Sequence, residues 1–173
     1  MEEKNLNRAT TIIALCALGL TFWQGHIQLK HNYKSLEPRI NSYLKVEGKN
    51  QKIGIYLINN GLGPAYIENL QVTVDGEPIK DEGEWGKFYE ALLKLKLSPT
   101  CFTVGGPRKN DSFSVGDEIF LIESNNNSEK HCALDNLLLV KYAKNRLNFT
   151  IKTKSIYDEK FEYQYQGNIQ KQL

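Results

Sequence analysis

The sequence predicts an N-terminal transmembrane α-helix followed by a mainly-β α+β domain, an immunoglobulin-like sandwich with two inserted helices. Three observations predict this class. An uncharged apolar run lies near the start of the 173 residues, most of the later chain alternates apolar and polar residues, and two stretches with a helical period interrupt that alternation. We expect a transmembrane and juxtamembrane helix over residues 1–37, a sandwich domain over 38–166 and a flexible tail over 167–173. The length excludes a multidomain enzyme, and the mean hydropathy of -0.47 excludes a polytopic membrane protein.

The apolar run covers residues 9–23 and holds no charged side chain. At about 1.5 Å per residue it spans only ~22 Å, so flanking residues must complete the ~30 Å of a bilayer core. Trp23 suits the headgroup boundary, and Arg8 and Lys30 can extend their charged ends to the two surfaces. We therefore predict one transmembrane helix over about residues 7–29. A cleaved signal peptide is the alternative, and it is disfavoured because acidic residues dilute the basic start and no clear small-residue cleavage site follows.

Basic residues beside the run predict its orientation. Two precede it and four follow it: Lys4 and Arg8, then Lys30, Lys34, Arg39 and Lys45. Cytoplasmic flanks carry the excess of Lys and Arg. We therefore expect a single-pass protein of a bacterial inner membrane, with its N-terminus outside and its C-terminal domain in the cytosol.

Two cysteines test that orientation. A cytosolic domain predicts that Cys101 and Cys132 are free thiols, whereas an oxidising compartment permits one disulfide. Their spacing does not decide between the two states. A disulfide would reverse the orientation and favour a periplasmic interaction module.

Alternating apolar residues predict the strands of the sandwich. The expected strands cover residues 40–46, 52–59, 65–74, 101–104, 118–123, 147–152 and 160–166. Asp75 and Gly76 follow the third of these strands and favour a tight hairpin turn, because both positions tolerate a positive φ.

Two helices are expected within this pattern. Residues 84–97 carry apolar side chains at spacings of three and four, and Pro99 ends this helix. Residues 129–144 are consistent with a second helix, which Ser128 can cap at its start.

Three stretches carry a resemblance to known proteins: TFWQGHIQLKHN after the apolar run, LINNGLGPAYIENLQV over residues 57–72, and SIYDEKFE over residues 155–162. On these stretches the chain resembles a loosely defined set of small bacterial single-pass membrane proteins with a cytosolic β-rich domain. In plan and size it is similar to the membrane effector of type III CRISPR systems that senses cyclic tetra-adenylate. The resemblance implies a non-enzymatic antiviral protein, whose cytosolic domain binds a cyclic oligoadenylate and transmits binding to the membrane helices of a homo-oligomer.

No enzyme motif is visible in the sequence. It contains no Gly-x-Ser-x-Gly, phosphate-binding loop or His-Glu-x-x-His pattern, and no CxxC or His/Cys spacing typical of zinc. Of the three histidines, only His131 lies in the predicted domain. We therefore expect a protein that is not an enzyme, with no catalytic residues, no metal and no cofactor.

A glycine-rich basic loop is the best candidate for ligand binding. Its residues are Gly105, Gly106, Arg108, Lys109 and Asn110. They combine a backbone free to expose N–H groups with two adjacent cations, which together suit phosphate oxygens. Lys130 and His131 can join this loop from the start of the second helix, because helix N-termini attract anions. The alternative is a solvated hairpin loop whose charges serve solubility.

Charge is unevenly distributed along the chain, although the formal net charge is only +2. Acidic residues dominate positions 65–90 and basic residues dominate 141–173, and such faces can pair between subunits or meet anionic lipid or nucleotide. Tyr157, Tyr163 and Tyr165 lie near the basic region and can stack on adenine, although alternating aromatic residues more often pack a sheet. Duplex nucleic acid is not an expected ligand at this net charge.

Two classes of function are open at this point. The first is the antiviral effector, with cyclic tetra-adenylate as ligand and with the lipid bilayer and further copies of the chain as partners. The second is a membrane-tethered adaptor whose β-domain recruits another protein and binds no small ligand. An adaptor co-purifies with a stoichiometric partner, whereas the effector forms a homo-oligomer.

Overall fold

The computed structural model describes residues 2–47, 52–80, 86–125 and 132–173. The chain divides into two units, one ending at Leu36 and one covering Glu37–Leu173. The first unit is a single helix, α1 (Glu2–Ser35). Within it, Thr10–Ser35 is long and apolar enough for a membrane span or a signal sequence. The predicted apolar helix is thus confirmed in this form.

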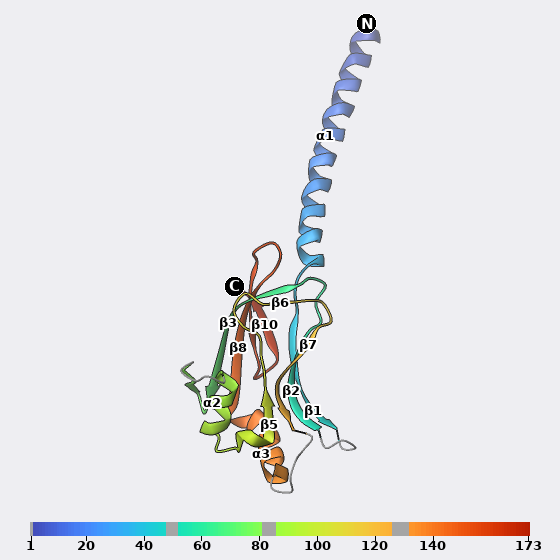
Figure 1. Ribbon diagram of the computed structural model, residues 1–173. Coiled ribbons are helices and arrows are strands. Elements are labelled where there is room, and N and C mark those ends of the chain that lie inside the picture. Colours follow the sequence, from blue (N-terminus) through green and yellow to red (C-terminus); the bar gives the residue numbers. More distant parts are fainter. Residues whose placement is uncertain (1, 48–51, 81–85, 126–131) are drawn as a thin grey trace. The chain divides into compact units, whose positions relative to one another are not determined.

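The second unit contains two antiparallel sheets that face each other (Figure 1). The first sheet has the order β1-β2-β7-β5, with β1 (Ile40–Glu47), β2 (Lys52–Asn59), β7 (Glu118–Ser124) and β5 (Phe102–Val104). The second has the order β10-β9-β8-β3-β4, with β10 (Ile169–Gln172), β9 (Lys160–Gln164), β8 (Leu147–Lys154), β3 (Ala65–Val74) and β4 (Glu77–Pro78). A short strand, β6 (Ser112–Phe113), also pairs with β3. The sandwich-like α+β class predicted from the sequence is confirmed.

The core lies between the two sheets and follows the alternation of the sequence. Leu147, Phe149 and Ile151 of β8 are buried, whereas the residues between them are partly exposed. The ring of Phe88 meets that of Phe149 edge-on, with the centroids 5.7 Å apart. Period-two burial therefore explains why these residues form strands.

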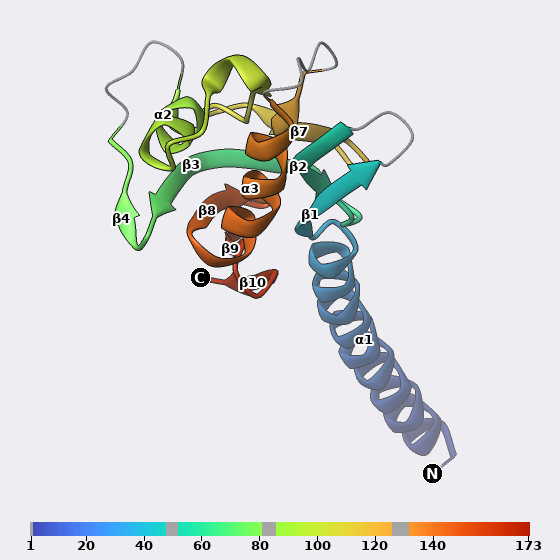
Figure 2. The ribbon, with the colours of Figure 1, turned by 90° about the horizontal axis from the view of Figure 1, so that it is seen from below.

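Two helices lie at the same end of the sandwich (Figure 2). They are α2 (Lys87–Lys94) and α3 (Cys132–Asn145), and a 3-10 turn, η1 (Pro99–Cys101), follows α2. Helix α2 ends earlier than expected, because Lys96 adopts a positive φ of 60° and the N–H of Leu97 donates back to the carbonyl of Leu92 at 3.0 Å. The expected starts of both helices, residues 84–85 and 129–131, lie outside the described residues.

The predicted hairpin turn after β3 is confirmed. Asp75 and Gly76 both have a positive φ, 53° and 81° respectively. Arg146, just after α3, donates from Nε to Asp75 Oδ1 at 2.8 Å, and this hydrogen bond lowers the pKa of the carboxyl group. The turn is therefore tied to the start of β8.

The expected flexible tail over residues 167–173 is instead part of the fold. Residues 169–172 form β10, which pairs antiparallel with β9. Gln170 reaches the first sheet, where its Nε2 donates to the carbonyl of Pro38 at 2.7 Å and its Oε1 accepts the N–H of Ile40 at 2.8 Å. The prediction was wrong because hydrogen bonds hold this polar edge strand, and such a strand has no apolar period to detect.

Candidate functional site

A cleft of about 670 Å³ lies between β3, the start of α2 and the loop that joins β5 to β6. Its lining residues are Glu68, Asn69, Leu70, Gly86, Lys87, Phe88, Val104, Gly105, Gly106, Pro107, Arg108 and Lys109. We call this region the β3 cleft. A second cavity of about 330 Å³ shares Glu68 and Lys109 with it. The two together follow β3 from Tyr66 to Leu70.

The predicted binding loop forms one wall of the β3 cleft. Gly105, Gly106, Arg108 and Lys109 line the cleft itself, and Asn110 lines the neighbouring cavity. The other two predicted binding residues, Lys130 and His131, lie outside the described residues. The structure therefore brings the loop residues together and leaves the helix-start contribution untested.

The two glycines of this loop have packing roles. A Cβ atom on Gly105 would lie 2.9 Å from both the carbonyl oxygen and the ring of Phe120, closer than such atoms approach in proteins. Gly106 has a φ of 142°, which favours glycine, and a Cβ atom there would contact Phe88. Close passage over β7 and α2 thus explains the glycines without a ligand.

Most backbone donors of the loop are already used. The N–H of Gly105 donates to a carbonyl of β7 at 3.0 Å, that of Arg108 to Asp111 Oδ2 at 2.8 Å, and that of Asn110 to a carbonyl of β3 at 2.8 Å. The expectation that this backbone is free to bind an anion is wrong at these three positions. An anionic group in the β3 cleft must be held by side chains.

Three cationic side chains of the cleft can hold such an anionic group. Arg108 is 89% exposed, and its Nε lies 3.8 Å from Asp111. Lys109 is exposed and forms no ion pair within the ranges that the structure describes. Lys87 donates from Nζ to the carbonyl of Leu70 at 2.7 Å, which holds its ammonium group beside β3.

One carboxylate accompanies these cations. Glu68 Oε1 lies 3.6 Å from Lys160 Nζ, and the Glu68 side chain is 31% exposed. Sequence reasoning missed Glu68 and Lys87, because only the packing of β3 and α2 against the loop brings them to it. Among the described residues, the cleft is therefore lined by more positive than negative groups.

Two of the tyrosines proposed for base stacking belong to the core. Tyr163 is 1% exposed, and its hydroxyl donates to Asn168 Oδ1 at 2.8 Å. The ring of Tyr165 stacks on Phe149 with the centroids 4.6 Å apart. Tyr157 remains 40% exposed. Sheet packing, the alternative drawn from the alternating pattern, is thus confirmed for Tyr163 and Tyr165.

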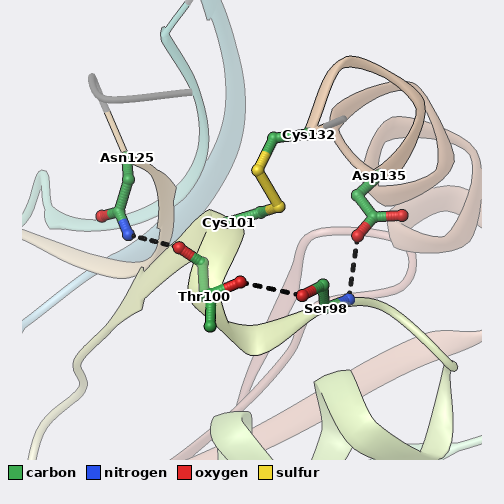
Figure 3. The surroundings of a disulfide bond; sticks show 6 residues. All are labelled: Ser98, Thr100, Cys101, Asn125, Cys132 and Asp135. Carbon is green, nitrogen blue, oxygen red and sulfur yellow. Dashed lines mark hydrogen bonds between the residues drawn. A yellow bond between two sulfur atoms is a disulfide. The ribbon is translucent and has the colours of Figure 1, made fainter. Parts of the chain in front are cut away.

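A disulfide joins Cys101 of η1 to Cys132, the first residue of α3 (Figure 3). The two Cα atoms are 5.5 Å apart, and the cysteines are 0% and 4% exposed. The free thiols expected for a cytosolic domain are therefore absent at these two positions. Cys16 of α1 is the free cysteine of the chain, and it is exposed.

Hydrogen bonds reinforce the surroundings of the disulfide. Asp135 accepts the N–H of Ser98 at 2.9 Å, which ties α3 to the segment before η1 (Figure 3). On the other side, Asn125 donates to the carbonyl of Thr100 at 2.9 Å. The disulfide is thus built into a fixed junction between η1, α3 and the end of β7.

A polar and aromatic cluster covers the outer face of the first sheet. The rings of Tyr43 and Tyr56 are stacked with centroids 5.5 Å apart, and Lys52 Nζ lies 2.7 Å from Glu123 Oε1. Hydrogen bonds from Lys52 and Tyr56 lower the pKa of Glu123, while burial, together with the Glu123 carboxylate, raises that of Tyr56. Each charge here has a partner, so we assign the cluster to stability.

Comparison with protein-family profiles, with curated proteins and with solved structures found no match. The resemblance to small bacterial membrane proteins therefore stays a prediction. Within the described ranges, no group of three or more His, Cys, Asp or Glu side chains is placed to hold a metal ion.

Proposed function

We propose that this protein is a membrane-tethered, non-enzymatic interaction module, whose β-domain lies on the non-cytosolic side and recruits a partner through the β3 cleft. The buried Cys101–Cys132 disulfide is the observation that carries this proposal. Such bonds persist in secreted and periplasmic proteins, whereas the cytosol keeps thiols reduced. Within this proposal the two sheets belong to an immunoglobulin-like sandwich.

The disulfide and the flanking charges favour opposite orientations. Four basic residues follow the apolar run and two precede it, which is a small excess. The disulfide closes a sequence separation of 31 residues at a buried junction. We give it more weight, because a buried, geometrically matched pair of cysteines is a more specific observation than two extra cations. The N-terminus then faces the cytosol, and α1 serves as the anchor.

The chemistry of the β3 cleft supports binding rather than catalysis. Among the described residues that line it, none carries a hydroxyl, thiol or imidazole group to act as a nucleophile or a base. The carboxylate of Glu68, the one among the cleft's described lining residues, is paired with Lys160. Apolar walls with a few polar groups at the rim are typical of a recognition site.

Thiol trapping in intact bacterial cells tests the orientation. The cells are treated with a small alkylating reagent, denatured, reduced and labelled with a maleimide polymer. We expect two labels per chain after reduction and none on a Cys101→Ser, Cys132→Ser variant, with Cys16 blocked in both. No label after reduction, or label that appears without reduction, would show free thiols and reject the proposal. Co-purification after cross-linking tests recruitment: a stoichiometric partner supports an adaptor, and a homo-oligomer alone contradicts it.

The antiviral effector is the second candidate. The adjacent cations Arg108 and Lys109 in a cleft favour it, because they suit the phosphates of cyclic tetra-adenylate. This candidate requires the domain to lie in the cytosol, where such a messenger is made. The thiol-trapping experiment therefore separates the two functions: free Cys101 and Cys132 favour the effector, and a disulfide favours the adaptor.

A further inference from the structure

We propose that the β3 cleft takes an extended acidic peptide segment of the partner, laid along β3. This inference rests on the proposed function and names the chemistry of what is recruited. Three features carry it: an interruption in the strand pairing of β3, the charges around that interruption, and the apolar wall beside it.

The first feature is the free edge of β3. On one side β3 pairs with β8 along most of its length. On the other side, β6 pairs only with Ala65 and Tyr66, and β4 only with Thr73 and Val74. In the described parts of the chain, no strand pairs with residues 68–71 on that second side.

The Lys87 side chain reaches this interval, where a neighbouring strand would otherwise pair. The carbonyl of Leu70 accepts the Lys87 ammonium group at 2.7 Å, a bond that a neighbouring strand would make through its backbone. Interrupted sheet edges accept extended peptides, because peptide backbone groups can replace such stand-in bonds. The cleft lies at this interval and is lined by Glu68, Asn69 and Leu70.

The second feature is the charge around the interval. Arg108 and Lys109 stand on one wall and Lys87 on another, and Glu68 is the one carboxylate among the lining residues that the structure describes. Arg108 is largely exposed and its Nε lies 3.8 Å from Asp111, a weak pairing for which a ligand carboxylate can compete. Acidic side chains complement this cleft, and Glu68 can accept a peptide N–H group.

The third feature favours a peptide over a nucleotide. Phe88, the aromatic residue of the lining, is 3% exposed and packs in the core, so no base can stack on it. Leu70, Val104 and Pro107 instead offer an aliphatic wall that suits an apolar side chain between two acidic ones. Glu68 also repels phosphate groups.

Peptide display on the full-length protein tests this proposal. The protein is purified in detergent micelles with its disulfide intact, and random nine-residue peptides are selected on it. We expect enrichment of Asp- and Glu-containing peptides. The best peptide, labelled with fluorescein, should lose more than about tenfold in affinity, or about 1.4 kcal/mol, on an Arg108→Glu, Lys109→Glu variant. A Lys141→Glu, Lys144→Glu variant carries the same charge change on α3 and should bind normally.

Backbone pairing is tested separately. Two versions of the peptide are made, one N-methylated at its odd and one at its even positions. One of the two should bind weakly, because strand addition uses every second peptide N–H. Equal binding of both N-methylated peptides would reject the placement along β3. An unchanged unfolding midpoint must accompany each variant, so that a loss of binding is not a loss of fold.

The contrary outcomes are equally definite. If no acidic peptides are enriched, or if they bind the Arg108→Glu, Lys109→Glu variant as tightly, the acidic peptide is rejected. If cyclic tetra-adenylate displaces the peptide and binds more tightly, the cleft belongs to a nucleotide. The membrane orientation is measured independently by thiol trapping, so the recruitment proposal survives a failure here if a disulfide and a stoichiometric partner are found.

Discussion

The side chain of Gln170 holds the edge of β1 by accepting the N–H of Ile40 at 2.8 Å and donating to the carbonyl of Pro38 at 2.7 Å. The two residues belong to different sheets, so this amide joins the sandwich at the end where β1 begins. We expect Gln170→Ala to lower the free energy of unfolding by about 1–3 kcal/mol, because two backbone groups lose their partner.

Urea unfolding of the full chain in micelles measures that loss. The control is Gln172→Ala in the same strand, an exposed residue whose Nε2 donates to Glu159 Oε1 at 3.3 Å. It should change the free energy of unfolding by less than about 0.5 kcal/mol. Equal effects of the two substitutions would contradict a special role for Gln170.

Removal of the disulfide should destabilise the domain. We expect a Cys101→Ser, Cys132→Ser variant to lose about 3–4 kcal/mol, because the open chain regains the entropy that a 31-residue separation had lost. Urea unfolding with and without a reductant measures the effect, and reduced wild-type protein should match the variant. Cys16→Ser is the control, since Cys16 is free, and a loss of the same size there would refute the assignment.

Asn59 is fully buried and should not tolerate a charge. Its Nδ2 donates to the carbonyls of Gly63 and Phe113 at 2.9 and 3.0 Å, and its Oδ1 accepts two backbone N–H groups. Asn59→Asp keeps the shape but removes both donors, so we expect a loss of roughly 3 kcal/mol at neutral pH. The loss should shrink as the pH falls and the new carboxyl group becomes protonated. Asn60→Asp, at an exposed position, should show no such pH dependence.

Tyr43 and Tyr165 should ionise late. Burial raises the pKa of Tyr165 to about 12; at Tyr43, which is still 37% exposed, partial desolvation and a hydrogen bond to Glu118 raise the pKa to about 12 as well. Because the folded pKa is the higher one, this stability is fully present below about pH 10 and is lost as the pH rises towards the folded pKa. Ultraviolet absorbance of tyrosinate measures the titration, and Tyr43→Phe and Tyr165→Phe should each remove one tyrosine from the late part of the curve. Ionisation of every tyrosine near pH 10 would contradict the burial.

Gly105 should prove necessary for folding and not for ligand contact. Gly105→Ala places a Cβ atom 2.9 Å from the backbone oxygen of Phe120, and we expect it to cost about 1–3 kcal/mol of stability. Lys109→Ala in the exposed part of the same loop should leave stability within about 0.5 kcal/mol. If Gly105→Ala is neutral in urea unfolding, the packing role assigned to this glycine is incorrect.

The parts of the fold that follow a periodic pattern could be predicted from the sequence. Strand β8 alternates apolar and polar residues, and the Asp75–Gly76 turn has a well-known preference, so both were found. Strand β10 was missed because its polar residues are held by hydrogen bonds to β9 and β1. Polar edge strands carry no burial signal.

Only part of the candidate site could be predicted from the sequence. The loop from Gly105 to Asn110 was found because glycines and adjacent cations are a local pattern. Glu68, Lys87 and the open edge of β3 were not found, because they meet the loop only after the strands pair and α2 packs. The sequence also could not decide whether Cys101 and Cys132 form a disulfide, because spacing along the chain says little about distance in space.

The bond between Gln170 and Ile40 also constrains the order of folding, because it spans 130 positions of sequence. Strand β1 emerges early from the ribosome, yet its outer edge has no partner until β10 has been made. In the orientation proposed above the domain crosses a membrane, and we expect this delay to help its export, because the edge of β1 stays incomplete until β10 has also been translocated. The hydrogen bond between Gln170 and Ile40 therefore also sets how late in synthesis the edge of β1 can be completed.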